Sequence, residues 1–321
     1  MKTEKRKVVL IGTGLVGMSM AYSLLNQRGI DELLLIDVNH DKAQGEAMDL
    51  SHGLPFATNS KMVIKAGDYS DCKDANIIVI TAGAAQKPGQ TRLELTAVNT
   101  RIMQGIAENI KQSGFGGVIV VASNPVDIMT YVVQKVTGFE AKKVFGSGTM
   151  LDTARLRYMI GQYLDINPTS VHVNVLGEHG DSSFVSWTNT YVGTKCLLEY
   201  VEENNKYLSE VLNLYDEVRD AAYEIIEKKK ATYYGIGLSL DHLVAVILNN
   251  EDSIVTISAY QNGEYGYDGV YIGTPAILSR DGVRSIVKLK LNAVDKRKFK
   301  NSVDSIQKVI DEVVDPILKE A

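Results

Sequence analysis

The N-terminal glycine cluster constrains the fold of this chain more than any other feature. A wholly apolar run, Val8–Ile11, leads into the sequence Gly-Thr-Gly-Leu-Val-Gly, and a helical pattern follows over Met18–Leu25. Glycines in this G-x-G-x-x-G spacing permit a tight strand-to-helix turn and a close approach of the backbone to a pyrophosphate, whose charge meets the helix N-terminus. The stretch predicts a βα unit that binds a dinucleotide at Gly12, Gly14 and Gly17.

An aspartate follows the second predicted strand at the spacing that such a site needs. The apolar run Leu33–Ile36 ends in Asp37, twenty positions after Gly17. A carboxylate there accepts hydrogen bonds from the ribose hydroxyls of adenosine and repels a 2′-phosphate, so NAD is favoured over NADP. A glycine motif alone is a weak signal, but strand, glycines, helix, strand and aspartate together are a strong one. The alternatives are a coincidental βα turn and a different nucleotide ligand.

Further strands and helices extend this unit into a sheet. Apolar runs at 76–81 and 117–122 predict strands, and residues 94–111 between them have helical periodicity. Strands that alternate with helices predict an α/β fold with a doubly wound, parallel Rossmann sheet. Because such sheets bind ligands beyond the carboxyl ends of their strands, we expect the functional residues in the loops that follow the strands.

The pattern changes from about Ser147 onward. Helices are predicted at 151–163, 208–229 and 298–319, and strands at 171–175, 254–258 and 269–275. This irregular order is typical of a mixed α+β domain. The length of 321 residues also suits two domains. We therefore expect a dinucleotide-binding Rossmann domain at 1–146 and a catalytic, substrate-binding domain at 147–321.

Composition argues against several classes of protein. The net charge of −5 disfavours a nucleic-acid-binding surface, which needs a basic patch. The two cysteines, Cys72 and Cys196, cannot build a disulfide framework, which favours a reducing compartment. The charged N-terminus lacks a signal-peptide core, and no apolar stretch approaches the roughly 20 residues that span a bilayer. We expect a cytoplasmic protein with no nucleic-acid or membrane partner and no metal site.

One histidine stands in a setting suited to proton transfer. His179 lies between glycines and carboxylates in Gly177–Asp181, just past the predicted strand at 171–175. An imidazole with an ordinary pKa of about 6.5 exchanges a proton near neutral pH. A lone histidine is as often a satisfied polar residue as a catalyst. The dinucleotide motif favours the catalyst, because an enzyme that reduces a keto group with a nicotinamide must protonate the oxygen as hydride reaches the carbon.

Three more side chains fit this reaction if the substrate is a 2-keto acid. Arg155 can grip the substrate carboxylate through a planar two-bond fork, and Asp152, on the same helix face, can orient the imidazole. Arg92 ends a polar loop that can close over the site, where the guanidinium would polarise the carbonyl while water is excluded. Taken singly, these residues also fit an intrahelical ion pair and a solvated surface arginine.

At these residues the sequence resembles the L-lactate and malate dehydrogenase family, and most closely its bacterial L-lactate dehydrogenases. The resemblance runs nearly end to end and rests on Gly12–Gly17, Asp37, Gln86–Arg92, Ser123–Asp127, Leu151–Arg157, Gly177–Asp181 and Ala231–Gly235. It implies an NAD-dependent oxidoreductase that interconverts pyruvate and L-lactate in fermentation. It also implies that His179 is the acid/base, Asp152 its orienting partner, Arg155 the carboxylate clamp and Arg92 the mobile polarising residue.

The resemblance further implies which residues line the two ligand sites. The substrate would contact Gln86, Arg92, Asn124, Asp152, Arg155 and Thr232. The cofactor would contact Gly12, Gly14, Val16, Gly17, Asp37, Lys42, Tyr69, Gly83, Ala84, Ala122, Ser123, Asn124 and Ser147. Lys230 departs from the family pattern, which usually has glycine at this position.

Gln86 is the position expected to separate the hydroxy acids. Similar malate dehydrogenases have an arginine here that pairs with the second substrate carboxylate, whereas neutral Gln86 leaves that charge unpaired. Pyruvate and L-lactate are therefore expected over oxaloacetate and malate. The segment Phe184–Trp187 looks more like the L-2-hydroxyisocaproate dehydrogenases, so larger 2-keto acids are an alternative. A dinucleotide-binding protein with an idle site is the non-enzymatic alternative.

Two cationic positions match a regulatory site of the family. Arg157 lies two residues beyond Arg155, so on a helix it points about 200° away and cannot serve the same pocket. Arg157 and His172 match the arginine and histidine with which many bacterial L-lactate dehydrogenases bind fructose 1,6-bisphosphate across a twofold subunit interface. The resemblance thus implies a homotetramer with this effector. The alternative is an ordinary surface arginine and a polar strand histidine.

Overall fold

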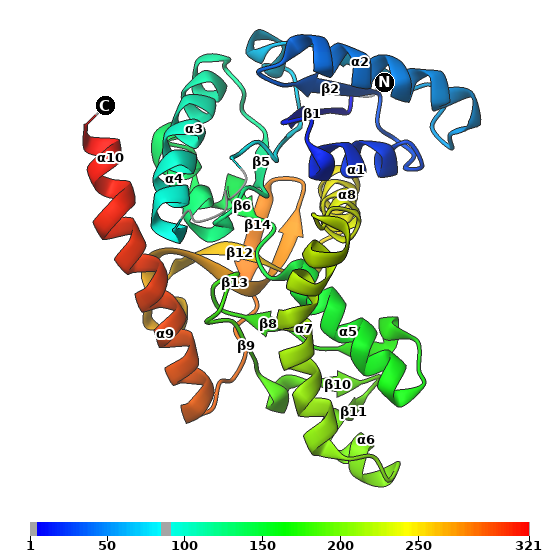
Figure 1. The fold of residues 1–321 in the computed structure, drawn as a ribbon, viewed down its shortest axis with the longest axis vertical. Coiled ribbons are helices and arrows are strands. Elements are labelled where there is room, and N and C mark those ends of the chain that lie inside the picture. Colours follow the sequence, from blue (N-terminus) through cyan, green and yellow to red (C-terminus); the bar gives the residue numbers. More distant parts are fainter. Residues whose placement is uncertain (1–4, 85–90, 321) are drawn as a thin grey trace.

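A parallel sheet forms the centre of the N-terminal half (Figure 1). The computed structural model describes residues 5–84 and 91–320. The strand order is β6-β5-β4-β1-β2-β3, and every neighbouring pair is parallel. This is the strand order of a doubly wound sheet, so the expected Rossmann sheet is confirmed. The strands are β1 (Lys7–Ile11), β2 (Glu32–Ile36), β3 (Val63–Ala66), β4 (Ile77–Ile80), β5 (Val118–Val121) and β6 (Val144–Gly146).

Helices cover both faces of this sheet, which explains why its strands are apolar throughout. Val8 and Leu10 of β1 pack with α1 (Leu15–Leu24), α2 (His40–Gly53) and α8 (Tyr234–Asn249). Val9 and Ile11 point the other way, into the core shared with α3 (Arg92–Gln112), α4 (Val126–Thr137) and α9 (Ala293–Val309). Successive side chains of a strand face opposite sides, so a sheet covered twice needs apolar residues at every position.

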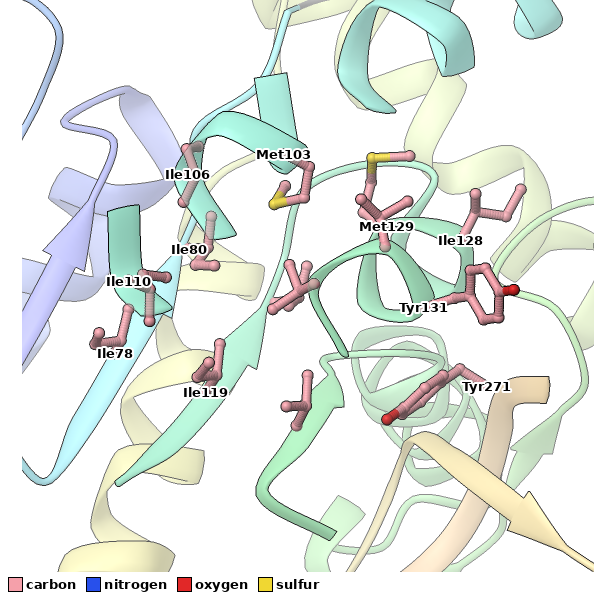
Figure 2. Packing of buried hydrophobic residues seen from close by; sticks show 14 of the residues in the cluster. Ile78, Ile80, Met103, Ile106, Ile110, Ile119, Ile128, Met129, Tyr131 and Tyr271 are labelled. Carbon is pink, nitrogen blue, oxygen red and sulfur yellow. The ribbon is translucent and has the colours of Figure 1, made fainter. Parts of the chain in front are cut away.

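Figure 2 shows the second of these cores at close range. Ile78 and Ile80 project from β4 toward α3, where Met103, Ile106 and Ile110 lie one turn apart. Ile128 and Met129 of α4 and Tyr271 of β13 (Asp268–Ser279) continue the same cluster. The packing therefore joins the N-terminal sheet to a strand from the C-terminal half.

Strands from the C-terminal half extend the central sheet instead of forming a separate one. β12 (Ser253–Asn262) pairs antiparallel with β6 at Ser258 and Gly146. β13 follows β12, and β14 (Gly282–Ile286) completes that edge, both antiparallel. Residues expected in a substrate domain thus lie directly beside the end of β6.

The predicted strand at 171–175 is wrong as a single element. The chain instead forms β7 (Val171–His172), which pairs with β10 (Tyr191–Val192), and β8 (Val175–Leu176), which pairs with β9 (Phe184–Val185). Between β7 and β8 the side chain of Asn174 accepts a hydrogen bond from Thr256 Oγ1 at 2.7 Å. The backbone N–H of Val175 donates to Thr153 Oγ1 at 3.0 Å. These bonds to other elements redirect the chain from one small sheet to the next.

The remaining elements are distributed over both halves of the chain. The helix predicted at 208–229 is α7 (Leu208–Lys229), with the expected bounds. The closing helix begins at Ala293, earlier than predicted, because the side chain of Asn292 caps the N–H groups of Val294 and Asp295. The other elements are α5 (Met150–Leu164), α6 (Leu197–Glu203), β11 (Lys195–Cys196), a π turn (Ile310–Val314), α10 (Asp315–Lys319) and 3-10 turns at Leu54–Phe56, Tyr69–Cys72, Ala141–Lys143, Pro168–Ser170, Trp187–Asn189 and Glu264–Gly266.

A helix that spans a bilayer needs roughly 20 predominantly apolar residues. Across residues 5–84 and 91–320, no single helix is both long and apolar enough to cross a bilayer. Among the described helices, only the pair of α7 and α8 reaches that length and composition, and the two are bent by 119° relative to each other.

Candidate active site

The glycine turn between β1 and α1 has the geometry of a phosphate-binding loop. Gly12 has φ +103°, and a Cβ there would lie 2.6 Å from the backbone nitrogen of Ala82. A Cβ on Gly17 would lie 2.2 Å from the carbonyl oxygen of Gly12, so only glycine fits either position. At Gly14, by contrast, nothing lies within 4 Å of a Cβ. The turn is closed toward the protein and open in front of the α1 N-terminus, which fits the pyrophosphate of a dinucleotide.

Asp37 is placed at the end of β2, directly beside this turn. Its Oδ2 accepts hydrogen bonds from the backbone N–H and the hydroxyl of Thr13, both at 2.8 Å, and its Oδ1 accepts from the N–H of Asn39 at 2.9 Å. Lys42 donates to the Thr13 carbonyl at 2.6 Å. Burial works to raise the pKa of Asp37, but the bonds from Asn39 and Thr13 outweigh it and lower the pKa below its usual value. Asp37 therefore carries a negative charge beside the turn.

The other predicted cofactor residues follow strands β4, β5 and β6. Asn99 accepts a hydrogen bond from the N–H of Ala84 at 2.8 Å, and Ser123 Oγ donates to the Ala82 carbonyl at 2.5 Å. The first bond fixes the loop after β4 to α3, and the second joins this loop to the loop after β5. Tyr69 lies elsewhere, at the start of a 3-10 turn, where its ring packs against the core and burial raises its pKa to about 12.

A cavity of about 310 Å³ brings together residues from both halves of the chain. Eight predicted site residues line it: Val16, Ala122, Asn124, Ser147, Asp152, Arg155, His179 and Thr232. Nine predicted cofactor residues do not: Gly12, Gly14, Gly17, Asp37, Lys42, Tyr69, Gly83, Ala84 and Ser123. Gln86 lies outside the described residues. Arg92 is the first residue of α3, which begins there because Thr91 and Glu94 form a capping box.

His179, Asp152 and Arg155 form one connected group at this cavity. His179 Nδ1 lies 2.7 Å from Asp152 Oδ2, and Arg155 Nη1 donates to Asp152 Oδ1 at 3.1 Å. An ionised carboxylate can only accept, so Nδ1 of His179 is the donor and Nε2 is left for a ligand. The side chains of Asp152 and Arg155 are each 15% exposed and that of His179 is 30% exposed, so the group is sheltered but accessible.

The pKa values of this pair move in opposite directions. Burial lowers the pKa of His179, but the charge of Asp152 and its hydrogen bond outweigh burial and raise it above the ordinary value. Burial likewise raises the pKa of Asp152, and the imidazolium and Arg155 outweigh it and lower that pKa. The arrangement therefore favours a charged imidazolium at neutral pH, as an acid catalyst requires.

Helix α5 holds Asp152 and Arg155 in place. Leu156 and Ile160 on its inner face are buried, and Thr153 Oγ1 accepts the hydrogen bond from Val175 N at the start of β8. β8 in turn leads into Gly177, and the histidine follows two residues later. One helix face thus carries both charged groups while its other face is fixed to the segment that carries His179.

Sequence reasoning missed the contribution of α7 to this site. Six residues of α7 line the cavity: Tyr215, Val218, Arg219, Ala222, Tyr223 and Ile226. The Tyr215 hydroxyl donates to Ser183 Oγ at 2.7 Å, and Ser183 Oγ donates to the Gly180 carbonyl at 2.8 Å. The sequence shows that the helix is amphipathic. Its pattern cannot show whether the apolar face packs into a hydrophobic core or lines a ligand cavity.

Sequence reasoning also assigned no role to Asp127. This residue is in the first turn of α4 and is only 2% exposed. Its Oδ2 accepts from the backbone N–H of His179 at 2.8 Å, and its Oδ1 accepts from the Ser258 hydroxyl at 2.5 Å. The sequence did offer a signal: Asp127 is a carboxylate only three residues after Asn124, which was itself a predicted ligand residue.

Arg157 and His172 lie outside the cavity lining. Arg157 donates from Nε to the carbonyl of Pro168 and from Nη2 to that of Thr169, both at 3.3 Å. His172 is exposed on β7, opposite Tyr191 of β10. The 3-10 turn at 168–170 therefore joins Arg157 to the start of the strand that carries His172. In the part of the chain that the structure describes, no group of three or more His, Cys, Asp or Glu residues is placed to hold a metal ion.

Comparison with known proteins gives the family. The sequence model of the lactate/malate dehydrogenase NAD-binding domain matches residues 6–146, and that of the α/β C-terminal domain of the same family matches residues 149–316. The chain is 49% identical over 314 residues to L-lactate dehydrogenase 2 of Lactococcus lactis subsp. lactis, covering 98% of this chain and all of the relative. It is 50% identical over 319 residues to L-lactate dehydrogenase 2 of Bacillus cereus (strain ZK / E33L), covering 99% of this chain and all of the relative.

Solved structures agree with these matches. A lactate dehydrogenase from a Medee basin deep-sea metagenome library has a TM-score of 0.94 and 51% identity, covering 97% of this chain and 99% of that one. The ligand-bound minor L-lactate dehydrogenase of Enterococcus mundtii has a TM-score of 0.94 and 47% identity, with the same coverage. NAD is thus confirmed as the cofactor by the family model over 6–146. The chain belongs to the lactate/malate dehydrogenase family of NAD-dependent 2-hydroxy acid oxidoreductases.

Proposed function

We propose that this protein is an L-lactate dehydrogenase that interconverts pyruvate plus NADH with L-lactate plus NAD⁺. The observation that carries the proposal is the connected group of His179, Asp152 and Arg155 at a cavity that also reaches Val16 beside the glycine turn. The identity of about half the residues to enzymes named L-lactate dehydrogenase 2, over nearly the whole chain, supports it.

His179 would supply and accept the proton of the reaction. In the direction of pyruvate reduction, the imidazolium donates a proton from Nε2 to the carbonyl oxygen, and Asp152 stabilises the charged ring through Nδ1. In the reverse direction, the neutral imidazole removes the hydroxyl proton of L-lactate. Asp152 thus keeps the ring in the tautomer that both directions need, as an orienting carboxylate does in other histidine-dependent enzymes.

Arg155 and the neighbouring side chains would hold the substrate. One guanidinium nitrogen of Arg155 is bonded to Asp152, and the other donors of this planar group can bind the carboxylate of pyruvate in a two-bond fork. Asn124 and Thr232 line the same cavity and would contact the rest of the substrate. Arg92 would polarise the carbonyl, as the resemblance of its loop to the family implies.

The glycine turn and Asp37 fit NAD, which when bound transfers a hydride between its nicotinamide ring and the carbonyl carbon. The open space at Gly14 admits the pyrophosphate, and the charged Asp37 favours ribose hydroxyls over a 2′-phosphate. Val16, Ala122 and Ser147, which line the cavity, would bring the ring beside His179.

The choice of hydroxy acid rests on Gln86. Because a neutral side chain at this position leaves a second carboxylate unpaired, pyruvate is preferred to oxaloacetate. Replacement by arginine should therefore raise kcat/KM for oxaloacetate relative to pyruvate. A class acting on larger 2-keto acids, such as the L-2-hydroxyisocaproate dehydrogenases, remains the alternative because of the segment Phe184–Trp187.

NADH oxidation tests the proposal directly. Absorbance would be followed with pyruvate, 2-ketoisocaproate and oxaloacetate, using the wild type and His179→Ala. Highest kcat/KM with pyruvate, and loss of turnover in the variant, are expected. A preference for 2-ketoisocaproate would place the protein in the alternative class, and NADH binding without turnover of any keto acid would overturn an enzymatic role.

We also propose that the protein forms a homotetramer that fructose 1,6-bisphosphate activates through Arg157 and His172. These residues flank one 3-10 turn, and two copies of the pair across a twofold axis would present four cationic groups when both histidines are protonated. Such a set suits a ligand with two phosphates. An effector that binds the active arrangement better shifts the population toward it.

A further inference from the structure

Asp127 connects three segments of the chain at the candidate active site. It belongs to the first turn of α4, three residues after Asn124. Its Oδ2 accepts from the N–H of His179 at 2.8 Å, and its Oδ1 accepts from the hydroxyl of Ser258 at 2.5 Å. Ser258 is on β12 opposite Gly146, the residue before Ser147. The carboxylate therefore links the segments that carry the proposed substrate and cofactor residues.

We propose that Asp127 is a positioning residue that fixes the main chain of His179 and, through its negative charge, favours the charged form of the imidazole. The inference rests on the role proposed above for His179. Asp127 does not line the cavity and would touch neither pyruvate nor NAD, so it would act only through the histidine.

The hydrogen bonds account for the positioning. His179 lies between glycines, which restrict the backbone little, so the local chain does not fix where the imidazole points. The bond from its N–H to Asp127 fixes the backbone, and the bond from Nδ1 to Asp152 fixes the ring. Two carboxylates on two different helices thus hold one residue at two points.

The electrostatic part follows from burial. Burial raises the pKa of Asp127 to about 6, although the bonds from Ser258 and His179 and the charge of His179 oppose that rise, whereas nearby Glu178 adds to it. His179 itself faces Asp127, Asp152 and Arg155. Among these groups, Asp152 and Asp127 raise the pKa of His179, while Arg155 lowers it. Ionised Asp127 thus makes the imidazole a weaker acid and a stronger base.

Asp127→Asn separates the charge from the shape. The amide oxygen can still accept the N–H of His179, and the Ser258 hydroxyl can rotate to accept from the amide nitrogen, so both contacts survive without the charge. As pH rises, kcat/KM for pyruvate should then begin to fall at a lower pH than in the wild type. We expect kcat/KM to fall about three- to tenfold at a pH on the alkaline limb, because a change of one pH unit corresponds to tenfold.

The reverse reaction distinguishes this effect from damage to the site. L-lactate oxidation needs the neutral imidazole, so its acidic limb should also move to lower pH and the variant should be relatively more active there. A merely structural defect would lower kcat/KM in both directions at every pH. NADH affinity, measured by fluorescence, should stay within about twofold of the wild type, because Asp127 bonds to His179 and Ser258, neither of which is a proposed cofactor residue.

Asp295 provides a matched control. It is also a buried aspartate in the first turn of a helix, and its Oδ2 accepts from the hydroxyl of Ser186 at 2.8 Å, away from the cavity. Asp295→Asn should leave both pH profiles unchanged. Ser258→Ala is a milder second variant: it keeps the charge and the bond to His179 but removes a bond that lowers the pKa of Asp127, so it should shift both limbs in the same direction by less.

The outcomes are distinguishable. Profiles of Asp127→Asn and Ser258→Ala that superimpose on the wild type would overturn the inference, as would an equal shift in Asp295→Asn. If Asp127→Asn does not fold, the Ser258→Ala profiles alone decide between the two outcomes. A wild type that binds NADH but turns over no 2-keto acid would overturn the proposed function itself, and the inference with it.

Discussion

The imidazole Nδ1 of His179 and the carboxylate Oδ2 of Asp152 lie 2.7 Å apart although 27 positions separate these residues in the sequence. The same carboxylate binds Arg155 through its other oxygen. The proposed proton donor and the proposed carboxylate-binding cation are thereby held by one anion. The spacing of the substrate carboxyl and keto groups in a 2-keto acid suits such a pair, because these two groups are adjacent in the molecule.

The pH dependence of pyruvate binding should report the protonation of His179. Its folded pKa is raised, so the charged form is present below the ordinary value of about 6.5 and persists somewhat above it. Pyruvate affinity should therefore be constant at low pH and fall up to about tenfold per pH unit once pH exceeds the folded pKa. KM for pyruvate at fixed saturating NADH measures this. A flat KM through the neutral and alkaline range would contradict the assignment.

Arg155→Lys should weaken substrate binding substantially, although the substitution keeps the positive charge. Lysine keeps the positive charge but cannot form the planar fork with a carboxylate. We expect KM for pyruvate to rise about ten- to hundredfold, in line with the loss of one charge-assisted hydrogen bond. NADH affinity serves as the internal control and should not change. An unaltered KM would mean that Arg155 serves only the ion pair with Asp152.

Asp37→Ser should reduce discrimination between the two nicotinamide cofactors. Removing the carboxylate removes the repulsion of a 2′-phosphate, so the ratio of kcat/KM for NADPH to that for NADH should rise at least about tenfold. Thr13→Val is the matched control, because it removes one hydrogen bond to Asp37 and leaves the charge in place. If both variants change the ratio equally, the shape of the turn and not the charge selects the cofactor.

Fructose 1,6-bisphosphate should lower KM for pyruvate in the wild type and promote the tetramer, measured by steady-state kinetics and light scattering. Arg157→Gln and His172→Gln should lose most of this response while keeping activity without effector. Arg101→Gln offers a comparison, since Arg101 is also a helical arginine bonded to a backbone carbonyl, on exposed α3 surface. A response absent from the wild type, or retained in both variants, would rule out this regulatory site.

Lys230→Gly should stabilise the protein. Lys230 ends α7 with φ +71°, in the left-handed region that is unfavourable for a side chain, where the family usually has glycine. Relief of this strain, partly offset by the greater freedom of glycine in the unfolded chain, should raise the free energy of unfolding by about 0.5 kcal/mol. Lys228→Gly, inside the same helix, should instead lower it by about 0.5–1 kcal/mol. Urea unfolding of each variant and the wild type, without bound ligand, measures the two changes in the free energy of unfolding.

Local patterns predicted the parts of the fold that local physics decides. The strand, glycine turn, helix and Asp37 of the first βαβ unit are where expected, because a sheet covered on both faces needs apolar strands and the turn needs residues without Cβ. The amphipathic α7 also has its predicted bounds. The family resemblance added the names of the site residues, eight of which line one cavity.

Patterns failed where another element determines the local structure. The single strand expected at 171–175 divides because Thr256 binds Asn174 between β7 and β8, and Thr153 binds Val175 at the start of β8. α8 was not predicted because it is apolar on most sides, so its sequence lacks the polar and apolar alternation of an amphipathic helix. The closing helix begins before its apolar stripe does, since the cap at Asn292 and not the stripe sets its start.

The sequence by itself determined the dinucleotide-binding unit, the preference for NAD and the residue types that a keto-acid reductase needs, because these depend on neighbouring residues and on side-chain chemistry. Only the tertiary structure showed that a second carboxylate, that of Asp127, also meets His179. Asp127 lies 52 positions before it and 131 before Ser258, so no local pattern connects the three. The path of the chain through one shared sheet brings them together. Burial there strengthens the electrostatic interactions between the charged groups, because water screens them less.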